Sequence, residues 1–265
     1  GGRDMSDALS EANVRAIVSP HVPRRDESDR VVSMGAGSND RESGRTYLAA
    51  MAPHGLAVPA WPERYGGRDA SPSEVALIGR TLREFAVPDL YPYSIGLRMV
   101  GPTLLELGTA EQCDRWLKRT AEGSLIWCQL FSEPDAGSDL ANVATVAHRD
   151  GDSWVLNGQK TWTSRGAYAD WGICLVRTDV DATKHAGLTM FAVDMRSPGV
   201  EVRPLRQMNG DDHFSETFLT DVVVPDACRV GAIGAGWKVA STVLAYERAG
   251  SDRSPAQSSG ENALP

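Results

Sequence analysis

The sequence has little of what several large classes of protein require. None of its apolar runs approaches the roughly 20 residues that a membrane span needs, and its first residues show no apolar core of a signal peptide. Its 27 Lys and Arg are outnumbered by 35 Asp and Glu, which gives a net charge of −8. That balance argues against a nucleic-acid surface. We therefore expect a cytoplasmic protein that holds any anionic ligand through backbone N–H groups and a few placed Arg or Lys.

Cysteine is also scarce. Cys113, Cys128, Cys174 and Cys228 stand far apart with no Cys-x-x-Cys pair, and the five histidines are scattered. A zinc site is therefore not expected, and a chain of 265 residues needs no disulfide framework. We expect reduced thiols, and histidines that belong to the surface or the core.

Helical signals dominate the first 123 residues. Two capping boxes, over residues 71–74 and 109–112, mark helix starts, and Gly123 is the expected stop of the second helix. Residues 23–43 are rich in Arg, Asp, Ser and Gly, which is typical of a loop or a disordered stretch. We expect residues 1–43 to be poorly ordered apart from a short helix over 7–18.

From Ser124 the pattern changes to short strands separated by turn residues. The predicted strands cover residues 124–131, 143–149, 154–156, 160–164, 171–177, 188–194, 200–206 and 216–224. Many short strands without an intervening helix indicate a barrel or sandwich. Helical spacing returns after Gly236, and the residues from Ser251 onward look like a flexible polar tail. The fold class is therefore α+β, with a helical domain over 1–123, a β-domain over 124–232, and a last helix with its tail over 233–265.

Two polar stretches in the β region carry candidate chemistry. The first reads Ser-Glu-Pro-Asp-Ala-Gly-Ser-Asp over residues 132–139, and the second reads Asn-Gly-Gln-Lys-Thr-Trp-Thr-Ser over 157–164. Pro134 forces an extended or turned step, and the turn after it offers N–H groups of the kind that hold phosphate oxygens. Trp162 adds a flat aromatic face. Together the stretches could hold a planar, phosphorylated cofactor. The alternatives are that the Gly-Ser turn only connects two strands, as such turns often do, and that the tryptophan belongs to the core, as a tryptophan in a strand usually does.

These stretches, in this order, resemble the flavin-binding signature of the acyl-CoA dehydrogenase family in its bacterial form. The resemblance runs from about Trp61 to Arg248. It implies a helical N-terminal domain, a β-domain and a C-terminal four-helix bundle, and this sequence holds only the start of that bundle. In the family, the missing part commonly supplies a carboxylate base, contacts to the adenosine half of FAD, and the tetramer core. We therefore expect a fragment, a truncated product or a degenerate paralogue.

The resemblance also implies FAD as cofactor and assigns residues to it. The implied flavin contacts are Gln129, Phe131, Ser132, Gly137, Ser138, Trp162, Thr163 and Ser164. Ser132 would bond the ring edge or ribityl chain, Trp162 would cover one ring face, and Ser164 would bond near N5 or O4. The turn at Ser138 would meet the pyrophosphate or the acyl-CoA. Asp135 departs from the family's small residue, and a carboxylate near phosphates is unfavourable unless it points outward.

The family reaction is α,β-dehydrogenation of an acyl-CoA thioester, in which a carboxylate removes the α-proton and a β-hydride passes to flavin. Glu247 matches the position of the base in some branches, and Arg248 matches a position near the CoA or acyl group. The alternative is a solvated surface Glu beside a surface Arg. Because burial and reach cannot be judged from sequence, both readings stay open here.

We therefore expect an FAD-dependent acyl-CoA dehydrogenase-like oxidoreductase that passes electrons to an acceptor within a homo- or hetero-oligomer. One alternative is a non-catalytic subunit paired with a full-length homologue, and another is a flavin-dependent oxygenase on the same scaffold. The sequence leaves open the acyl chain, for which a branched, aromatic or sterol-derived group is as admissible as a straight one.

Overall fold

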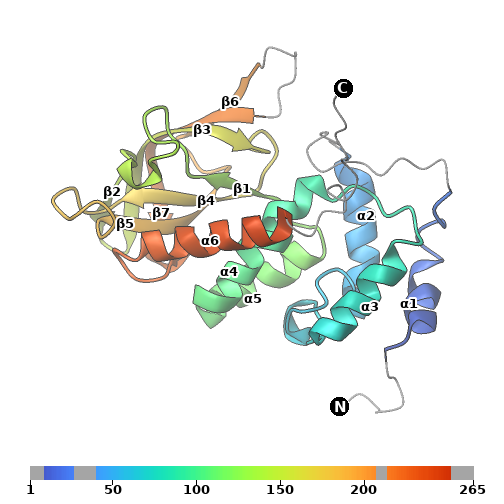
Figure 1. Ribbon diagram of the computed structural model, residues 1–265. Coiled ribbons are helices and arrows are strands. Elements are labelled where there is room, and N and C mark those ends of the chain that lie inside the picture. Colours follow the sequence, from blue (N-terminus) through green and yellow to red (C-terminus); the bar gives the residue numbers. More distant parts are fainter. Residues whose placement is uncertain (1–8, 27–39, 207–213, 252–265) are drawn as a thin grey trace, which may run out of the picture.

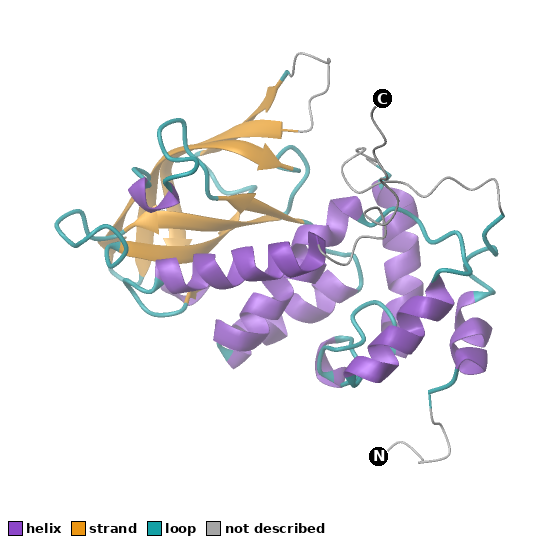
Figure 2. Ribbon diagram, viewed as in Figure 1, coloured by secondary structure: helices purple, strands orange, loops and turns teal. Residues whose placement is uncertain are grey.

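The computed structural model describes residues 9–26, 40–206 and 214–251. Its architecture is α+β, with a helical N-terminal part, a β part, and one last helix that lies along both (Figure 1, Figure 2). Among the described residues, no helix has the length and apolar character to cross a bilayer. All four cysteines are buried and unpaired, as expected for reduced thiols.

Side-chain caps mark the starts of four of the described helices, those beginning at Glu11, Arg41, Pro72 and Ala110. The helices of the N-terminal part are α1 (Glu11–Val18), α2 (Arg41–Met51), α3 (Pro72–Leu82), the π-helix η4 (Gly96–Val100), α4 (Gly101–Leu107) and α5 (Ala110–Ala121). Both predicted capping boxes are confirmed, at Ser71 with Glu74 and at Thr109 with Gln112. The π-helix η4, which runs directly into α4, was not predicted.

The short helix expected over residues 7–18 is present as α1. Ser10 caps α1 by accepting a hydrogen bond from the N–H of Asn13 at 3.1 Å, and Val14 and Val18 are fully buried. Residues 1–8 and 27–39 lie outside the described residues, as does the expected tail beyond residue 251.

The strands pair into one eight-stranded sheet that curls on itself (Figure 2). It is ordered β6-β7-β3-β2-β4-β5-β8, and β1 pairs with β4 in parallel. The strands are β1 (Trp127–Leu130), β2 (Val146–Asp150), β3 (Ser153–Ser164), β4 (Trp171–Arg177), β5 (Leu188–Asp194), β6 (Val200–Leu205), β7 (Phe214–Pro225) and β8 (Arg229–Val230). Two separate strands over 154–156 and 160–164 were expected, and this expectation was wrong. Both belong to β3, which pairs with β7 throughout and absorbs two register shifts, near Gly158 and between Lys160 and Thr163.

A tryptophan cluster joins the helical part to the sheet. The ring centroids of Trp116 on α5 lie 5.7 Å from those of Trp127 on β1 and 5.2 Å from those of Trp171 on β4, both edge-on. The indole N–H of Trp127 donates to the hydroxyl of Thr120 at 3.0 Å. Edge-on aromatic pairs of this kind add to the free energy of burial, so the helices and the sheet share one core.

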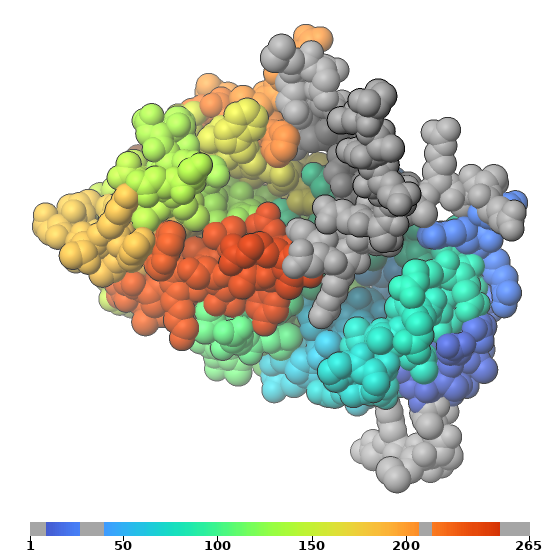
Figure 3. All heavy atoms as spheres, in the orientation of Figure 1, coloured from blue at the N-terminus to red at the C-terminus, as the bar shows by residue number. Residues whose placement is uncertain are grey.

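The last helix, α6 (Gly236–Ser251), packs on β5, η4 and α4. Figure 3 shows α6 lying on the surface across both the β part and the helices beneath it. Its residues Val239, Ala240 and Val243 are buried. The far end of α6 is thereby held beside η4, where the candidate site lies.

Candidate functional site

The two polar stretches lie side by side because hydrogen bonds join them. The N–H of Thr161 donates to the carbonyl of Ser132 at 2.8 Å. One residue earlier, the ammonium of Lys160 donates to the carbonyl of Phe131 at 3.2 Å and to that of Leu175 at 2.6 Å. The segment after β1 is therefore fixed against the last residues of β3, although almost thirty residues separate the two segments in the sequence.

A buried ion pair lies at the centre of this junction. The Lys160 ammonium is 2.7 Å from the Glu133 carboxylate, and the two residues are 0% and 5% exposed. Glu133 also accepts the N–H groups of Ala144 at 2.6 Å and Thr145 at 3.0 Å. Burial alone raises the pKa of Glu133, but the charge and hydrogen bond of Lys160, with those two N–H groups, hold that pKa below its ordinary value. The ammonium of Lys160 thus has three acceptors, and both carboxylate oxygens of Glu133 accept hydrogen bonds.

The Glu-Pro step forms a tight turn. Glu133 and Ala136 exchange both backbone hydrogen bonds, at 3.0 and 3.1 Å, with Pro134 and Asp135 between them. Asp135 is exposed, as are Gly137 and Ser138 after the turn. Gly137 and Ser138 therefore lie on the surface, outside the cavity described below.

Trp162 does not belong to the core. Its indole is 60% exposed, and its backbone has the left-handed φ of 56°. One edge-on contact with Phe214, at 5.7 Å between ring centroids, holds the ring. A large aromatic ring that is exposed to solvent and sits on a residue with an unfavourable backbone conformation is typical of a functional position.

The neighbours of these residues differ in what they can offer a ligand. Thr163 is fully buried and accepts a hydrogen bond from the hydroxyl of Thr217 at 3.4 Å. Phe131 is 4% exposed. Both predicted contacts are therefore closed off from a ligand in this structure. Ser132 and Ser164 are half-buried residues, and Ser164 lines the cavity described below.

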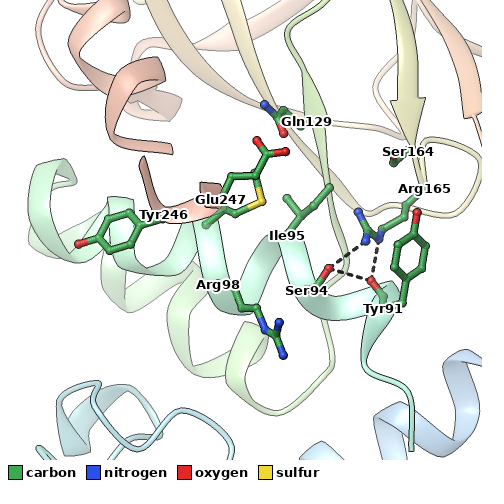
Figure 4. Close-up of a pocket in the computed structure, with 10 residues that line it drawn as sticks. Tyr91, Ser94, Ile95, Arg98, Gln129, Ser164, Arg165, Tyr246 and Glu247 are labelled. Atoms are coloured by element: carbon green, nitrogen blue, oxygen red, sulfur yellow. Dashed lines mark hydrogen bonds between the residues drawn. The ribbon is translucent and has the colours of Figure 1, made fainter. Parts of the chain in front are cut away.

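A cavity of about 240 Å³ lies where η4, β1, β3 and α6 meet (Figure 4). It is lined by Tyr91, Ser94, Ile95, Arg98, Met99, Gln129, Ser164, Arg165, Tyr246 and Glu247. Three predicted site residues, Gln129, Ser164 and Glu247, come together here. Glu247 reaches from the end of α6 toward Gln129 in Figure 4. Arg248 is exposed and does not line the cavity.

The sequence reasoning missed the residues on the helical wall and the arginine after β3. Arg165 is 7% exposed and has a left-handed φ of 68°. Its guanidinium donates to the carbonyl of Tyr91 at 2.7 Å and to the hydroxyl of Ser94 at 2.8 Å. It also stacks 3.9 Å from the centroid of the Tyr91 ring. A cation placed directly after the Trp-Thr-Ser run was the signal available for finding it.

Comparison with known proteins gives matches along most of the chain. Residues 10–124 match the family model "Acyl-CoA dehydrogenase, N-terminal domain", and residues 128–222 match "Acyl-CoA dehydrogenase, middle domain". The chain is 52% identical over 201 residues to acyl-CoA dehydrogenase FadE34 of Mycobacterium tuberculosis, a match that covers 75% of this chain and 28% of that protein. It is 41% identical to acyl-CoA dehydrogenase IpdE1 of the same organism, over 78% of this chain and 54% of that protein.

Solved structures of similar fold include assemblies of two different chains. The Tcur3481-Tcur3483 steroid ACAD is 33% identical, with a TM-score of 0.72, over 91% of this chain and 60% of that chain. The ChsE4-ChsE5 complex from Mycobacterium tuberculosis is 32% identical, with a TM-score of 0.68, over 92% of this chain and 61% of that chain. The sequence thus spans between about a quarter and three fifths of the proteins it matches. The two family domains match in order along the chain, and the similar relatives and solved structures agree with them: this chain belongs to the acyl-CoA dehydrogenase family.

Proposed function

We propose that this chain binds FAD on the surface formed by residues 132–138 and 162–164 and takes part in α,β-desaturation of an acyl-CoA thioester. The observation that supports the proposal most is the cavity, which Glu247 lines together with Gln129 and Ser164. The family is one of flavoproteins, and FAD when bound would supply the hydride acceptor.

The accessible groups fit a flavin. The exposed indole of Trp162 provides an uncovered apolar face that a flat ring system can stack on. The hydroxyls of Ser132 and Ser164 are half-buried and can donate to or accept from polar ring atoms. The buried pair of Lys160 and Glu133 keeps these two serines in a fixed relation, which lowers the ordering cost of binding.

Glu247 is the proposed base. An α-proton can pass to its carboxylate only if the acyl α-carbon lies within hydrogen-bond reach of it, and the cavity offers the space for that carbon. Gln129 lines the same cavity and can orient the thioester. Gly137, Ser138 and Arg248 are exposed outside the cavity, and their proposed role is to contact CoA or the pyrophosphate.

The solved structures of similar fold suggest which oligomeric assembly and which substrate class to test. Two of them are complexes of two different chains, and one is named a steroid ACAD. We accordingly propose that this chain works in an oligomer with a family member, that its electrons pass to a separate acceptor, and that a steroid-derived acyl-CoA is one substrate class to test.

The first test is retention of flavin. The purified chain, alone and mixed with a candidate partner, is incubated with FAD, desalted, and examined for a visible flavin band. We expect a retained band that Trp162→Ala weakens, since the substitution removes the stacking face. Absence of flavin from the chain under both conditions would refute the proposed cofactor.

The second test addresses the base. Glu247→Gln should retain flavin but abolish its bleaching by acyl-CoA under anaerobic conditions, because the amide cannot take a proton. Glu201→Gln is the matched control, since Glu201 is exposed on β6 and pairs with Arg203. Unchanged bleaching in Glu247→Gln would show that the base is another residue. If the bleached flavin is bound to a partner chain, this chain acts as a non-catalytic subunit.

A further inference from the structure

Arg165 places a buried positive charge on the wall of the cavity. The residue is 7% exposed, yet none of the ion pairs within the described residues includes it. Its partners are the Tyr91 carbonyl at 2.7 Å, the Ser94 hydroxyl at 2.8 Å and the Tyr91 ring. These contacts use Nε and Nη2, and no hydrogen bond from Nη1 is formed to the described residues. A guanidinium carries five N–H donors, so donor capacity is left over at the cavity wall.

The surroundings of Arg165 leave its charge largely uncompensated. The groups that act on it are the phenols of Tyr91 and Tyr168, the thiol of Cys128 and the carboxyl group of Asp89. Asp89 accepts the N–H of Tyr91 at 2.9 Å, and its carboxylate acts on Arg165 only from a distance. Burial lowers the pKa of Arg165, but an arginine stays protonated in proteins. Retaining a buried cation without a carboxylate partner is costly unless a ligand supplies one.

The position of Arg165 points to the acyl group rather than the flavin. In Figure 4 its guanidinium is directed toward Ser94 and Tyr91 on the helical wall, and Gln129 and the Glu247 carboxylate lie at another end of the cavity. The apolar side chains of Ile95 and Met99 also line the space. An acyl chain whose α-carbon lies near Glu247 could therefore run along apolar groups and end near Arg165.

On these grounds we propose that the cavity accepts an acyl-CoA whose acyl group ends in a carboxylate, and that Arg165 is the residue that selects it. The inference rests on the proposed function, since it assumes that the cavity is the acyl site. A carboxylate matches the planar donor edge of a guanidinium, and charge-assisted hydrogen bonds of this kind are stronger than neutral ones. A hydrocarbon end would instead leave the charge buried against apolar groups.

The test compares two thioesters that differ only at the far end of the acyl group. Glutaryl-CoA and valeryl-CoA have acyl chains of equal carbon number, and only glutaryl-CoA carries the terminal carboxylate. Binding of each to the FAD-treated full chain, with its partner where one is required, is measured by titration calorimetry. The CoA part is common to both, so the ratio of the two dissociation constants isolates the acyl end. We expect glutaryl-CoA to bind on the order of 10- to 100-fold more tightly.

Variants then assign the preference to the arginine. Arg165→Gln should bring the ratio close to one, and Arg165→Lys should retain part of it because the charge remains. Arg203→Gln, on the exposed strand β6, is the matched control and should leave the ratio unchanged. If Arg165→Gln does not fold, Ser94→Ala gives a second reading, since it removes one anchor of the guanidinium and should reduce the ratio.

The possible outcomes distinguish a failure of the carboxylate preference from a failure of the proposed acyl-CoA function. A wild-type ratio near one, with both thioesters bound, would overturn the carboxylate preference and leave the proposed function standing. A preference that persists in Arg165→Gln would overturn the role of Arg165. If neither thioester binds, the acyl-CoA function itself is refuted, and the inference falls with it.

Discussion

Replacing Lys160 by Met tests whether the buried ion pair holds the two signature stretches together. Met fills a similar volume but cannot donate to Glu133 or to the carbonyls of Phe131 and Leu175, all within 3.2 Å of the ammonium. The Glu133 carboxylate, 5% exposed, would keep only its two backbone donors. Removing one partner of a buried pair typically costs about 3–5 kcal/mol. We expect a loss of that size in the free energy of unfolding.

Urea unfolding followed by tryptophan fluorescence measures the loss. The partner variant Glu133→Leu and the double variant complete a cycle, in which the double variant should lose less than the sum of the two single losses because neither charge is left alone. Flavin retention should fall with Lys160→Met, since Ser132 and Ser164 are no longer held in register. A loss under about 1 kcal/mol, the range of exposed pairs, would refute the assigned role.

The pH dependence provides an independent check on the same pair. Burial raises the pKa of Glu133, but Lys160 and the hydrogen bonds hold that pKa below the ordinary 4.5. A lowered carboxyl pKa stabilises the folded state above pH 4.5, and this contribution is lost as the pH falls through the folded value. In Lys160→Met only burial and the two N–H groups act on the Glu133 carboxylate. Protonation of Glu133 should therefore remove part of the cost of burying an unpaired charge in the variant. The stability difference between wild type and Lys160→Met should therefore narrow on acidification, and a constant difference would contradict the argument.

Two further predictions concern stability away from the cavity. Arg229 helps to lower the pKa of Asp226 from 3.8 to about 2, so Asp226→Asn should lower the unfolding midpoint at pH 7, and this difference should vanish as the pH falls through about 2. Gly96→Ala should cost about 1–3 kcal/mol by overpacking, because its new Cβ would lie 2.8 Å from the buried ring of Trp127. Gly79→Ala is its control and should stabilise by about 0.5–1 kcal/mol in urea unfolding, since its Cβ would have no neighbour within 4 Å.

The sequence was most informative where local chemistry decides the structure. The capping boxes at Ser71 and Thr109 were found because the cap and the residue three positions on satisfy each other's N–H groups. Strands β4 and β5 were found with their observed bounds because they are short, apolar runs between turns, and both are buried almost throughout. In such segments, propensity and tertiary packing favour the same structure.

It was least informative where tertiary contacts override the local pattern. Gly158 and the polar residues around it interrupt the alternation expected of a strand, yet pairing with β7 carries β3 through two register shifts. The π-helix η4 was not predicted from the local pattern, and its Gly96 lies close against Trp127 and Thr120. Such π-helical turns occur frequently at functional sites, and η4 indeed contributes Arg98 and Met99 to the cavity wall.

The sequence predicted individual residues of the candidate site, but not which of them lie together. That arrangement depends on contacts between segments that are distant in the sequence. The signature resemblance located Gln129, Ser164 and Glu247, but their meeting depends on where α6 ends. That end is fixed by the buried face of α6 and by the hydroxyl of Tyr246, which donates to Glu106 on α4 at 3.2 Å. Tyr246 precedes Glu247 directly, so this contact holds the backbone next to the candidate base. The residues given above as lining the cavity all lie within 91–247, so the reach of Glu247 can be tested on this chain.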